Sequence, residues 1–357
     1  MSGRNRWYSE RVYSMAEVRR VVVKGIDDVL IETVQAPSPG IGEVLVEPTL
    51  VGICGSDVHA AHGRHPFVPL PFEPGHEVVG RIVEVGGGVD RSQIGRRVII
   101  DPSAHCGHCE QCQAGRYNIC DSIDVFGCLS PGGLTDIFAI PAERTIPIPE
   151  DVTDEVAVLT EPMSTPVHAV GRAGDLSGKR VVVVGAGAIG AFIAICAQRA
   201  GAAVVVVEDV VQSKLDRALR LGATAVVDST SPTAVADVVA ALGGKAHVVF
   251  DTVANEATVA AAIRSLLVKG GRLMLVGVPA GAVKVDLHLV QDNELEIIGN
   301  LMFLREDMMS ALGILRSNAF PIDEIVSAVF SLEDVSEAFL AADSRETVKV
   351  LVRMGSK

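Results

Sequence analysis

Residues 180–201 read RVVVVGAGAIGAFIAICAQRAG, in which an unbroken run of valines passes through closely spaced glycines into an alanine-rich segment. The valines predict a buried β-strand, and the segment after the glycines predicts a helix. The glycines follow the pattern G-x-G-x-x-G, whose small residues let the backbone approach a pyrophosphate at the positive end of the helix. The stretch therefore predicts a dinucleotide-binding unit, with a glycine-rich turn that binds no nucleotide as the alternative. The residues expected at the pyrophosphate are Gly185, Gly187, Ala188, Ile189 and Gly190.

A second strand-like run, AAVVVVED at residues 202–209, follows the predicted helix and ends in two acids. Dinucleotide-binding folds hold the adenosine ribose with an acid about 20 residues after the glycines. Neighbouring residues of a strand point to opposite faces, so we expect one acid to face the ribose: Asp209, with Glu208 as the alternative. No basic residue stands beside the pair before Lys214. An unscreened carboxylate repels the 2′-phosphate of NADP, and the sequence therefore favours NAD.

The same alternation of strand-like and helical stretches extends on both sides of this unit, from about residue 166 to residue 299. Strand-like runs alternate with alanine-rich helical stretches, which is typical of a doubly wound parallel sheet in an α/β protein. The further strand-like runs are ATAVVD (223–228), AHVVFDT (246–252), GRLMLVGV (271–278) and LEIIGNL (295–301).

The two ends of the chain differ from this middle part. Short β-like runs separated by glycine- and proline-rich turns predict a compact β-rich unit over residues 21–150. These runs are VLIETV (29–34), EVLVEP (43–48), VVGRIVEV (78–85) and RRVII (96–100). From about residue 300 the sequence predicts a helix, a strand, a second helix and a final strand, at 305–318, 327–330, 332–343 and 348–354.

The composition limits the classes of partner. The chain has 357 residues, a formal net charge of −13 and 48% hydrophobic residues, which is typical of a soluble globular protein with two domains. Its acidity offers no basic face for nucleic acid, and no apolar run approaches the roughly 18–20 residues that cross a bilayer. Residues 1–15, MSGRNRWYSERVYSM, lack the apolar core of a secretory signal and predict an exposed tail, with a transit peptide as an open alternative. We expect a cytoplasmic protein.

A cluster of cysteines lies in the β-rich part, within HCGHCEQCQAGRYNIC at residues 105–120. Reduced thiols so close together more often bind metal than form disulfides. The spacing is C-x2-C-x2-C-x7-C, whereas ferredoxin-like iron–sulfur runs place the fourth cysteine after three residues and before a proline. Four thiolates that leave no position for water describe a structural zinc site. An iron–sulfur cluster and ordinary loop cysteines are the alternatives. The four residues are Cys106, Cys109, Cys112 and Cys120.

Two further segments of the β-rich part carry metal-ligand residue types in glycine-bracketed turns. GICGSDVH, residues 52–59, includes Cys54, and EPGHEVVG, residues 73–80, includes His76. Functional side chains often lie on such loops. A lone cysteine is also often a small core residue and a lone histidine often a satisfied structural one, so neither segment is decisive alone.

Together, these two segments, the cysteine cluster and VVVVGAGAIG resemble, in order and separation, the zinc-dependent medium-chain alcohol and polyol dehydrogenases. The resemblance covers the chain from Met15 onward. It implies a GroES-like catalytic domain over 16–165, completed by 300–357, a Rossmann domain over 166–299, and an active site between them. It also implies a homodimer or homotetramer.

The resemblance implies a catalytic zinc bound by Cys54 and His76. At the place of a second thiolate this chain has Glu161, in LTEPMSTPVHAV (159–170), which is similar to the branch containing sorbitol, threonine and butanediol dehydrogenases. A carboxylate ligand is harder and more labile than a thiolate, so water or Glu77 can exchange in the fourth position. With the cysteine cluster, the chain is expected to hold two zinc ions.

The activity implied by the resemblance is hydride transfer between NAD(H) and a secondary alcohol, diol, polyol or amino alcohol and its ketone. Zinc would lower the pKa of the bound alcohol, and the proton would leave through Ser56, the cofactor ribose and His59. His59 is otherwise a solvated loop histidine.

The substrate is less defined by the sequence. Sorbitol-type enzymes carry a substrate-binding arginine in the segment matching GNLMFLRED, but here Met302 and Phe303 stand there, with Arg305 out of register. The missing arginine counts against a fully hydroxylated polyol as the substrate. Met302 and Phe303 are equally well explained as core residues and as residues of the substrate pocket. The alternatives from other classes are a zinc-free quinone or enoyl reductase of the same superfamily and a non-catalytic NAD-binding protein.

Overall fold

The structure is a computed structural model and describes residues 17–279, 281–317 and 320–355. The tail expected over residues 1–15 lies outside these ranges. The described chain begins with an antiparallel hairpin of β1 (Glu17–Gly25) and β2 (Asp28–Gln35). β1 also forms an isolated bridge between Val23 and Phe72, which ties the hairpin to the rest of the β-rich part.

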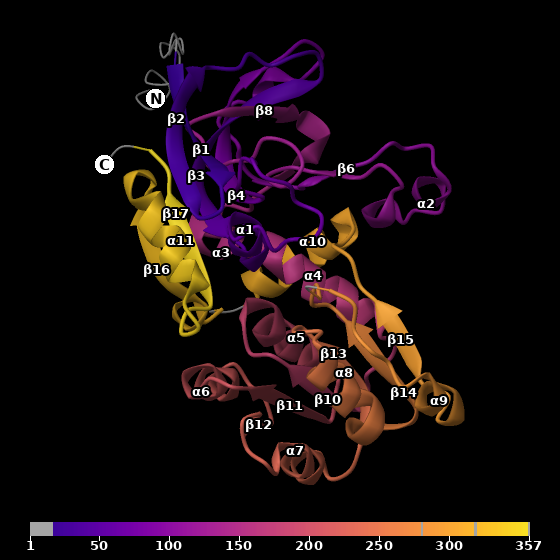
Figure 1. Ribbon diagram of the computed structural model, residues 1–357. Helices are drawn as coiled ribbons and strands as arrows, with labels where there is room; N and C mark the ends of the chain where they lie inside the picture. The colour runs from indigo at the N-terminus through magenta and orange to yellow at the C-terminus, as the bar shows by residue number, and fades with distance from the viewer. Residues whose placement is uncertain (1–16, 280, 318–319, 356–357) are drawn as a thin grey trace.

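Strands from both ends of the chain form one sheet, in the order β16-β17-β3-β4-β5-β9, with β8 paired to β3. The C-terminal β17 runs antiparallel to β3, and Figure 1 shows the yellow C-terminal strands beside the indigo N-terminal part. The last segment of the chain therefore completes the N-terminal sheet. The strands are β3 (Glu43–Ile53), β4 (Glu77–Val85), β5 (Arg97–Ile100), β8 (Phe138–Pro141), β9 (Thr145–Pro147), β16 (Val326–Ser331) and β17 (Lys349–Arg353).

The middle of the chain forms a second sheet in the order β12-β11-β10-β13-β14-β15, and every neighbouring pair is parallel. The chain starts in the centre at β10 and winds first to one side and then to the other, so the predicted doubly wound α/β fold is confirmed. β14 begins earlier than the sequence suggested, because a π-helical turn over Ala262–Leu266 leads directly into it. The strands are β10 (Arg180–Val184), β11 (Val204–Asp209), β12 (Ala225–Asp228), β13 (Ala246–Asp251), β14 (Leu267–Leu275) and β15 (Glu296–Gly299).

Helices cover this second sheet, and Figure 1 shows them around its strands in the lower part of the view. Their buried alanines and valines allow close packing on the β-branched strands. These helices are α5 (Ala188–Arg199), α6 (Gln212–Arg220), α7 (Ala234–Leu242), α8 (Glu256–Ala261) and α9 (Leu287–Asp292).

A continuous hydrophobic core joins the two sheets. It runs from Leu50 and Val79 of the first sheet through Met163 and Ala169 to Val181 and Val183 of the second. Met163 and Ala169 belong to helix α4 (Thr160–Arg172), which packs along α5. The first residues of α5 follow the glycine turn. The packing therefore fixes the position of the β-rich part relative to the glycine turn. The remaining helices are α1 (Gly55–Ala61), α3 (Asp154–Ala157), α10 (Arg305–Arg316) and α11 (Val335–Asp343).

The cysteine cluster lies in a lobe that Figure 1 shows projecting from the side of the molecule. The lobe contains the short pair β6 (Ser103–Ala104) and β7 (Asp124–Val125) and the one-turn helix α2 (Glu110–Gln113). Within the described ranges, no helix combines the length and apolar character needed to span a membrane.

Candidate active site and metal centres

The ends of β3 and β4 bring three metal-ligand side chains together. Cys54 follows β3 and precedes α1, while His76 and Glu77 lie at the start of β4. One potential ligand atom from each of these residues lies within 4.8 Å of the other two. The two loop segments singled out in the sequence therefore form one cluster. Glu161, the expected third ligand, is not a member of this group, whereas Glu77 is.

Glycine at position 52 makes room for the Glu77 carboxylate. The antiparallel register places Gly52 opposite Glu77, and a Cβ atom at Gly52 would lie 1.9 Å from Glu77 Oε2. The Glu77 side chain is fully buried, so it has no solvent into which to move. Gly52 opens the GICGSDVH segment, but only the strand register shows that it lies opposite Glu77.

We expect Gly52→Ala to lower kcat/KM about 10- to 100-fold, as is usual when a residue that orients a metal ligand is altered. The reason is the clash that forces the Glu77 carboxylate out of its position. Steady-state kinetics measure the loss of kcat/KM, and metal analysis of the purified protein measures whether zinc is lost with it. Gly171→Ala is the matched control, because Gly171 is an exposed helix residue with nothing within 4 Å of an added Cβ. Wild-type turnover in Gly52→Ala would contradict the assigned position of the Glu77 side chain.

A buried lysine from the C-terminal strand pairs with Glu77. Lys349 Nζ lies 2.5 Å from Glu77 Oε1 and also donates to the carbonyl of Ile53, at 3.2 Å. Burial alone lowers the pKa of Lys349, but the negative charges of Glu77 and Cys54 outweigh it and raise that pKa. Glu77 Oε2 has no hydrogen-bond partner although it is buried. One carboxylate oxygen is thus held by Lys349, and the other is left for a ligand.

Asp57 supports the same cluster from α1. Its Oδ2 accepts a hydrogen bond from the backbone N–H of Cys54, at 3.0 Å, and its Oδ1 lies 3.5 Å from His76 Nδ1. Burial lowers the pKa of His76, yet the charges of Asp57, Cys128 and Cys54 raise it well above its ordinary value. The cluster is therefore rich in negative charge, and a cation is the group it fits. Thiolate, imidazole and carboxylate are the donor types that zinc takes in proteins.

The other residues expected at this site lie around the cluster. Glu161 is half-buried in the first turn of α4, where burial of its carboxyl raises its pKa to about 8 and the charge of His76 opposes that shift. Ser56 is half-buried on α1. His59 is on the same helix and is exposed to solvent, which is the position a proton carrier to bulk water requires.

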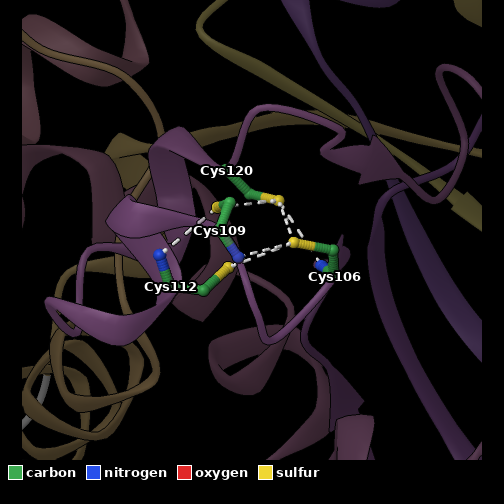
Figure 2. A group of neighbouring side chains, drawn as sticks. All are labelled: Cys106, Cys109, Cys112 and Cys120. Carbon is green, nitrogen blue, oxygen red and sulfur yellow. Dashed lines mark hydrogen bonds between the residues drawn. The ribbon is translucent and has the colours of Figure 1, made fainter.

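The four lobe cysteines turn their sulfur atoms toward one another, as Figure 2 shows. The distance from Cys106 Sγ is 3.5 Å to Cys120 Sγ and 3.9 Å to Cys112 Sγ. Cys109 Sγ and Cys120 Sγ are 3.8 Å apart. A tetrahedral zinc ion with Zn–S bonds of about 2.3 Å requires sulfur–sulfur distances of about 3.8 Å. The cluster therefore has the size of a four-thiolate zinc site.

Backbone N–H groups favour thiolates in this lobe. Cys120 Sγ accepts from the N–H groups of Cys106 and Ser122, both at 3.4 Å, and these bonds lower the pKa of Cys120 to about 6. Burial and the neighbouring thiols instead raise the pKa of Cys112 to about 12. Four sulfurs cannot all ionise at this separation without a cation, and a bound metal would remove that conflict.

The glycine turn has the geometry of a phosphate-binding turn. Gly190 packs so closely that a Cβ atom there would lie 1.8 Å from the carbonyl oxygen of Gly185. Gly187 caps α5 and has nothing within 4 Å of an added Cβ. Ala188 and Ile189 open the helix. The turn therefore leaves open space in front of the helix N-terminus, where an anion is favoured.

The two acids at the end of β11 differ in their surroundings. Glu208 is 7% exposed, and burial together with the charge of Asp251 raises its pKa to about 7. Asp209 is half-buried, and its carboxylate accepts from the N–H groups of Ala186, at 2.6 Å, and Val211, at 2.9 Å. Asp209 is thus the acid in contact with the glycine turn.

Met302 and Phe303 are explained by packing in the core. Phe303 is 1% exposed and belongs to the core that joins the sheets, and Met302 packs against it. The guanidinium of Arg305 donates to the carbonyls of Glu143, at 2.8 Å, and Thr145, at 2.9 Å. These contacts explain Arg305 as a structural residue.

Comparison with known proteins agrees with this architecture. A family model described as an alcohol dehydrogenase GroES-like domain matches residues 40–150, and one described as a zinc-binding dehydrogenase matches residues 188–317. A sorbitol dehydrogenase of Ovis aries is 36% identical over 95% of this chain and 97% of its own length. An L-threonine 3-dehydrogenase of Idiomarina loihiensis is 32% identical over 89% of this chain and 94% of its own length.

Two solved structures share the fold over nearly the whole chain. An alcohol dehydrogenase of Escherichia coli CFT073, complexed with NADH, has a TM-score of 0.88 and 27% identity and covers 95% of this chain and 100% of its own. A protein of Sinorhizobium meliloti 1021 described as a zinc-binding dehydrogenase, bound to NADP, has a TM-score of 0.88 and 29% identity, covering 94% and 99%.

The chain belongs to the zinc-type medium-chain alcohol dehydrogenase family, as its motifs indicated. Because the matched models describe dehydrogenase domains, the chain is an oxidoreductase.

Proposed function

We propose that this protein transfers a hydride between NAD(H) and a secondary alcohol, diol, polyol or amino alcohol, at a zinc ion held by Cys54, His76 and a carboxylate. The observation that carries the proposal is the convergence of Cys54, His76 and Glu77, with one buried carboxylate oxygen left without a partner. The sorbitol and threonine dehydrogenases among the relatives support the range of substrates.

The residues around the proposed zinc site have distinct roles. Lys349 holds one Glu77 oxygen and so orients the carboxylate. Asp57 fixes the start of α1 and faces His76 Nδ1, which leaves Nε2 for the metal. Zinc, when bound, supplies a Lewis acid that favours ionisation of the alcohol. The Ser56 hydroxyl would take up the released proton while it gives its own proton to the cofactor ribose, and the exposed His59 would pass the proton on to solvent.

We further propose a second zinc per chain, bound by the four lobe cysteines, with no catalytic part. Their sulfur–sulfur distances support it. The catalytic domain is proposed to comprise residues 16–165 and 300–357, and the dinucleotide-binding domain residues 166–299. The single sheet shared by the chain ends supports this division.

The test of the function is a screen of secondary alcohols, diols, polyols and amino alcohols for NAD reduction, combined with metal analysis of the same protein. We expect two zinc ions per chain and loss of activity when a chelator removes the more labile ion. Activity that persists without zinc would overturn the proposal in favour of a zinc-free reductase.

Replacing Asp209 with alanine is expected to weaken NAD binding by about 1–3 kcal/mol, or roughly 5- to 150-fold, and to narrow the preference over NADP. The reason is that the Asp209 carboxylate is the proposed hydrogen-bond acceptor for the adenosine ribose of NAD, and its charge repels the 2′-phosphate of NADP. Steady-state kinetics with both cofactors measure the change. Glu208→Ala is the matched comparison and should do less, because Glu208 is buried. A larger effect at Glu208, or a wild-type preference for NADP, would contradict this assignment.

Comparison of Glu77→Ala with Glu161→Ala tests which of the two carboxylates is the third ligand of the catalytic zinc. Because Glu77 lies in the cluster and Glu161 outside it, we expect the Glu77 variant to lose more zinc and more turnover. NAD affinity should be nearly unchanged in both, since the cofactor binds the other sheet. Metal content and kcat are the measurements. The reverse order would make Glu161 the third ligand.

A further inference from the structure

A second cysteine contacts His76 of the catalytic cluster. Cys128 Sγ lies 3.7 Å from His76 Nδ1, 52 residues away in the chain. Asp57, His76 and Cys128 form a group in which one candidate ligand atom from each lies within 4.8 Å of the others. Neither the sequence motifs nor the proposed function assigns a part to Cys128.

Close backbone packing fixes Cys128 in this position. A Cβ atom at Gly127 would lie 2.8 Å from His76 N, and one at Gly132 would lie 2.3 Å from Pro74 O. The N–H of Gly133 donates to the carbonyl of Gly75, at 2.8 Å. The loop that carries Cys128 is therefore pressed against the segment that carries His76, so the contact is built by the fold.

The contact matters because His76 Nδ1 has two neighbours. Asp57 Oδ1 lies 3.5 Å from Nδ1, which is long for a hydrogen bond to oxygen, and this oxygen has no hydrogen-bond partner. The sulfur contact, at 3.7 Å, is within the usual range for a hydrogen bond to sulfur. The orientation of the imidazole ring thus depends on the cysteine as well as on the aspartate.

We propose that Cys128 is a positioning residue of the catalytic metal site, which accepts the Nδ1 hydrogen of His76 alongside Asp57 and thereby turns Nε2 toward the metal. The inference rests on the proposed function, because it needs a metal at Cys54 and His76. Partners of metal-bound histidines fix the tautomer and the ring orientation, and their loss weakens metal binding.

Cys128 also borders a cavity of about 480 Å³, which is lined in addition by Phe72, Leu129 and Pro131. Cys128 therefore both lines this cavity and contacts the histidine. A smaller side chain here would extend the cavity toward His76 and leave the Nδ1 hydrogen with the aspartate alone.

The test measures the affinity for the labile zinc in the full-length protein, by competition with a chromophoric chelator. We expect Cys128→Ala to bind this zinc about 10- to 100-fold more weakly. Cys128→Ser should recover most of the affinity, because a hydroxyl also accepts a hydrogen bond. Cys196→Ala is the matched control and should bind as the wild type does, since Cys196 is a buried thiol of α5 outside the site.

Substitution of cobalt at the labile position supplies a second readout. A thiolate ligand gives a sulfur-to-cobalt absorption band, so Cys54→Ser should lose that band and Cys128→Ser should keep it. Wild-type zinc affinity in Cys128→Ala would overturn the inference, and so would loss of the band in Cys128→Ser, which would make Cys128 a direct ligand. Unchanged labile zinc in Cys54→Ser would instead overturn the proposed function.

Discussion

Cys54→Ser is expected to lower kcat/KM for alcohol oxidation by about three orders of magnitude, which corresponds to about 4 kcal/mol of lost transition-state stabilisation. The reason is that Cys54 is the proposed thiolate ligand, and the imidazole and carboxylate that remain beside it would hold zinc less tightly. Steady-state kinetics with NAD, together with metal analysis, measure the loss of activity and of one zinc ion per chain.

NAD affinity should be nearly unchanged in the Cys54 variant, because the glycine turn and Asp209 lie on the other sheet. Cys196→Ala is again the control for loss of a cysteine elsewhere. Near-normal turnover in Cys54→Ser would contradict the assignment of the site. A parallel loss of NAD binding would point to a misfolded variant and not to a lost ligand.

The second large effect is expected on stability. Cys112→Ser should abolish zinc binding in the lobe and lower the free energy of unfolding by about 3 kcal/mol. At about 2–4 °C per kcal/mol, this loss corresponds to a decrease in Tm of roughly 10 °C. Turnover per folded molecule should change little, because Cys112 is in the projecting lobe and outside the catalytic cluster. Thermal unfolding, metal content and kcat of the folded fraction are the measurements.

His108→Ala is the matched control for this variant. His108 is an exposed residue of the same loop, and its Nδ1 lies 2.8 Å from the carbonyl oxygen of Cys106 rather than at a sulfur atom. We expect it to keep both zinc ions and a wild-type Tm. Two zinc ions and a wild-type Tm in Cys112→Ser would remove the basis for a structural zinc.

The features that could be predicted from the sequence are those whose physical cause is local. The valine run, the glycines and the following helix are contiguous, so their strand–turn–helix geometry depends on few residues outside them. The lobe cysteines also come from one short loop, and their spacing alone brings the sulfurs into range of one ion. Alternation of strand and helix likewise predicted the parallel sheet.

The composition of the catalytic cluster could not be predicted in the same way. The family resemblance implied Cys54, His76 and Glu161 as ligands, with Glu77 only as a group that can exchange in the fourth position, whereas the acid that lies beside Cys54 and His76 is Glu77. The register of β3 against β4 places Gly52 opposite Glu77 and gives the carboxylate its space. A register is set by two whole strands, so no single motif reports it.

The sequence by itself determined the fold class, the family and the residues that local spacing brings together. The tertiary structure alone decided which distant groups complete the site. Lys349 meets Glu77 across 272 residues because β17 pairs with β3, and Cys128 meets His76 because glycines let two loops pack in contact. Such contacts arise from sheet pairing and close backbone packing, which depend on the whole fold and leave no pattern in a short stretch of sequence.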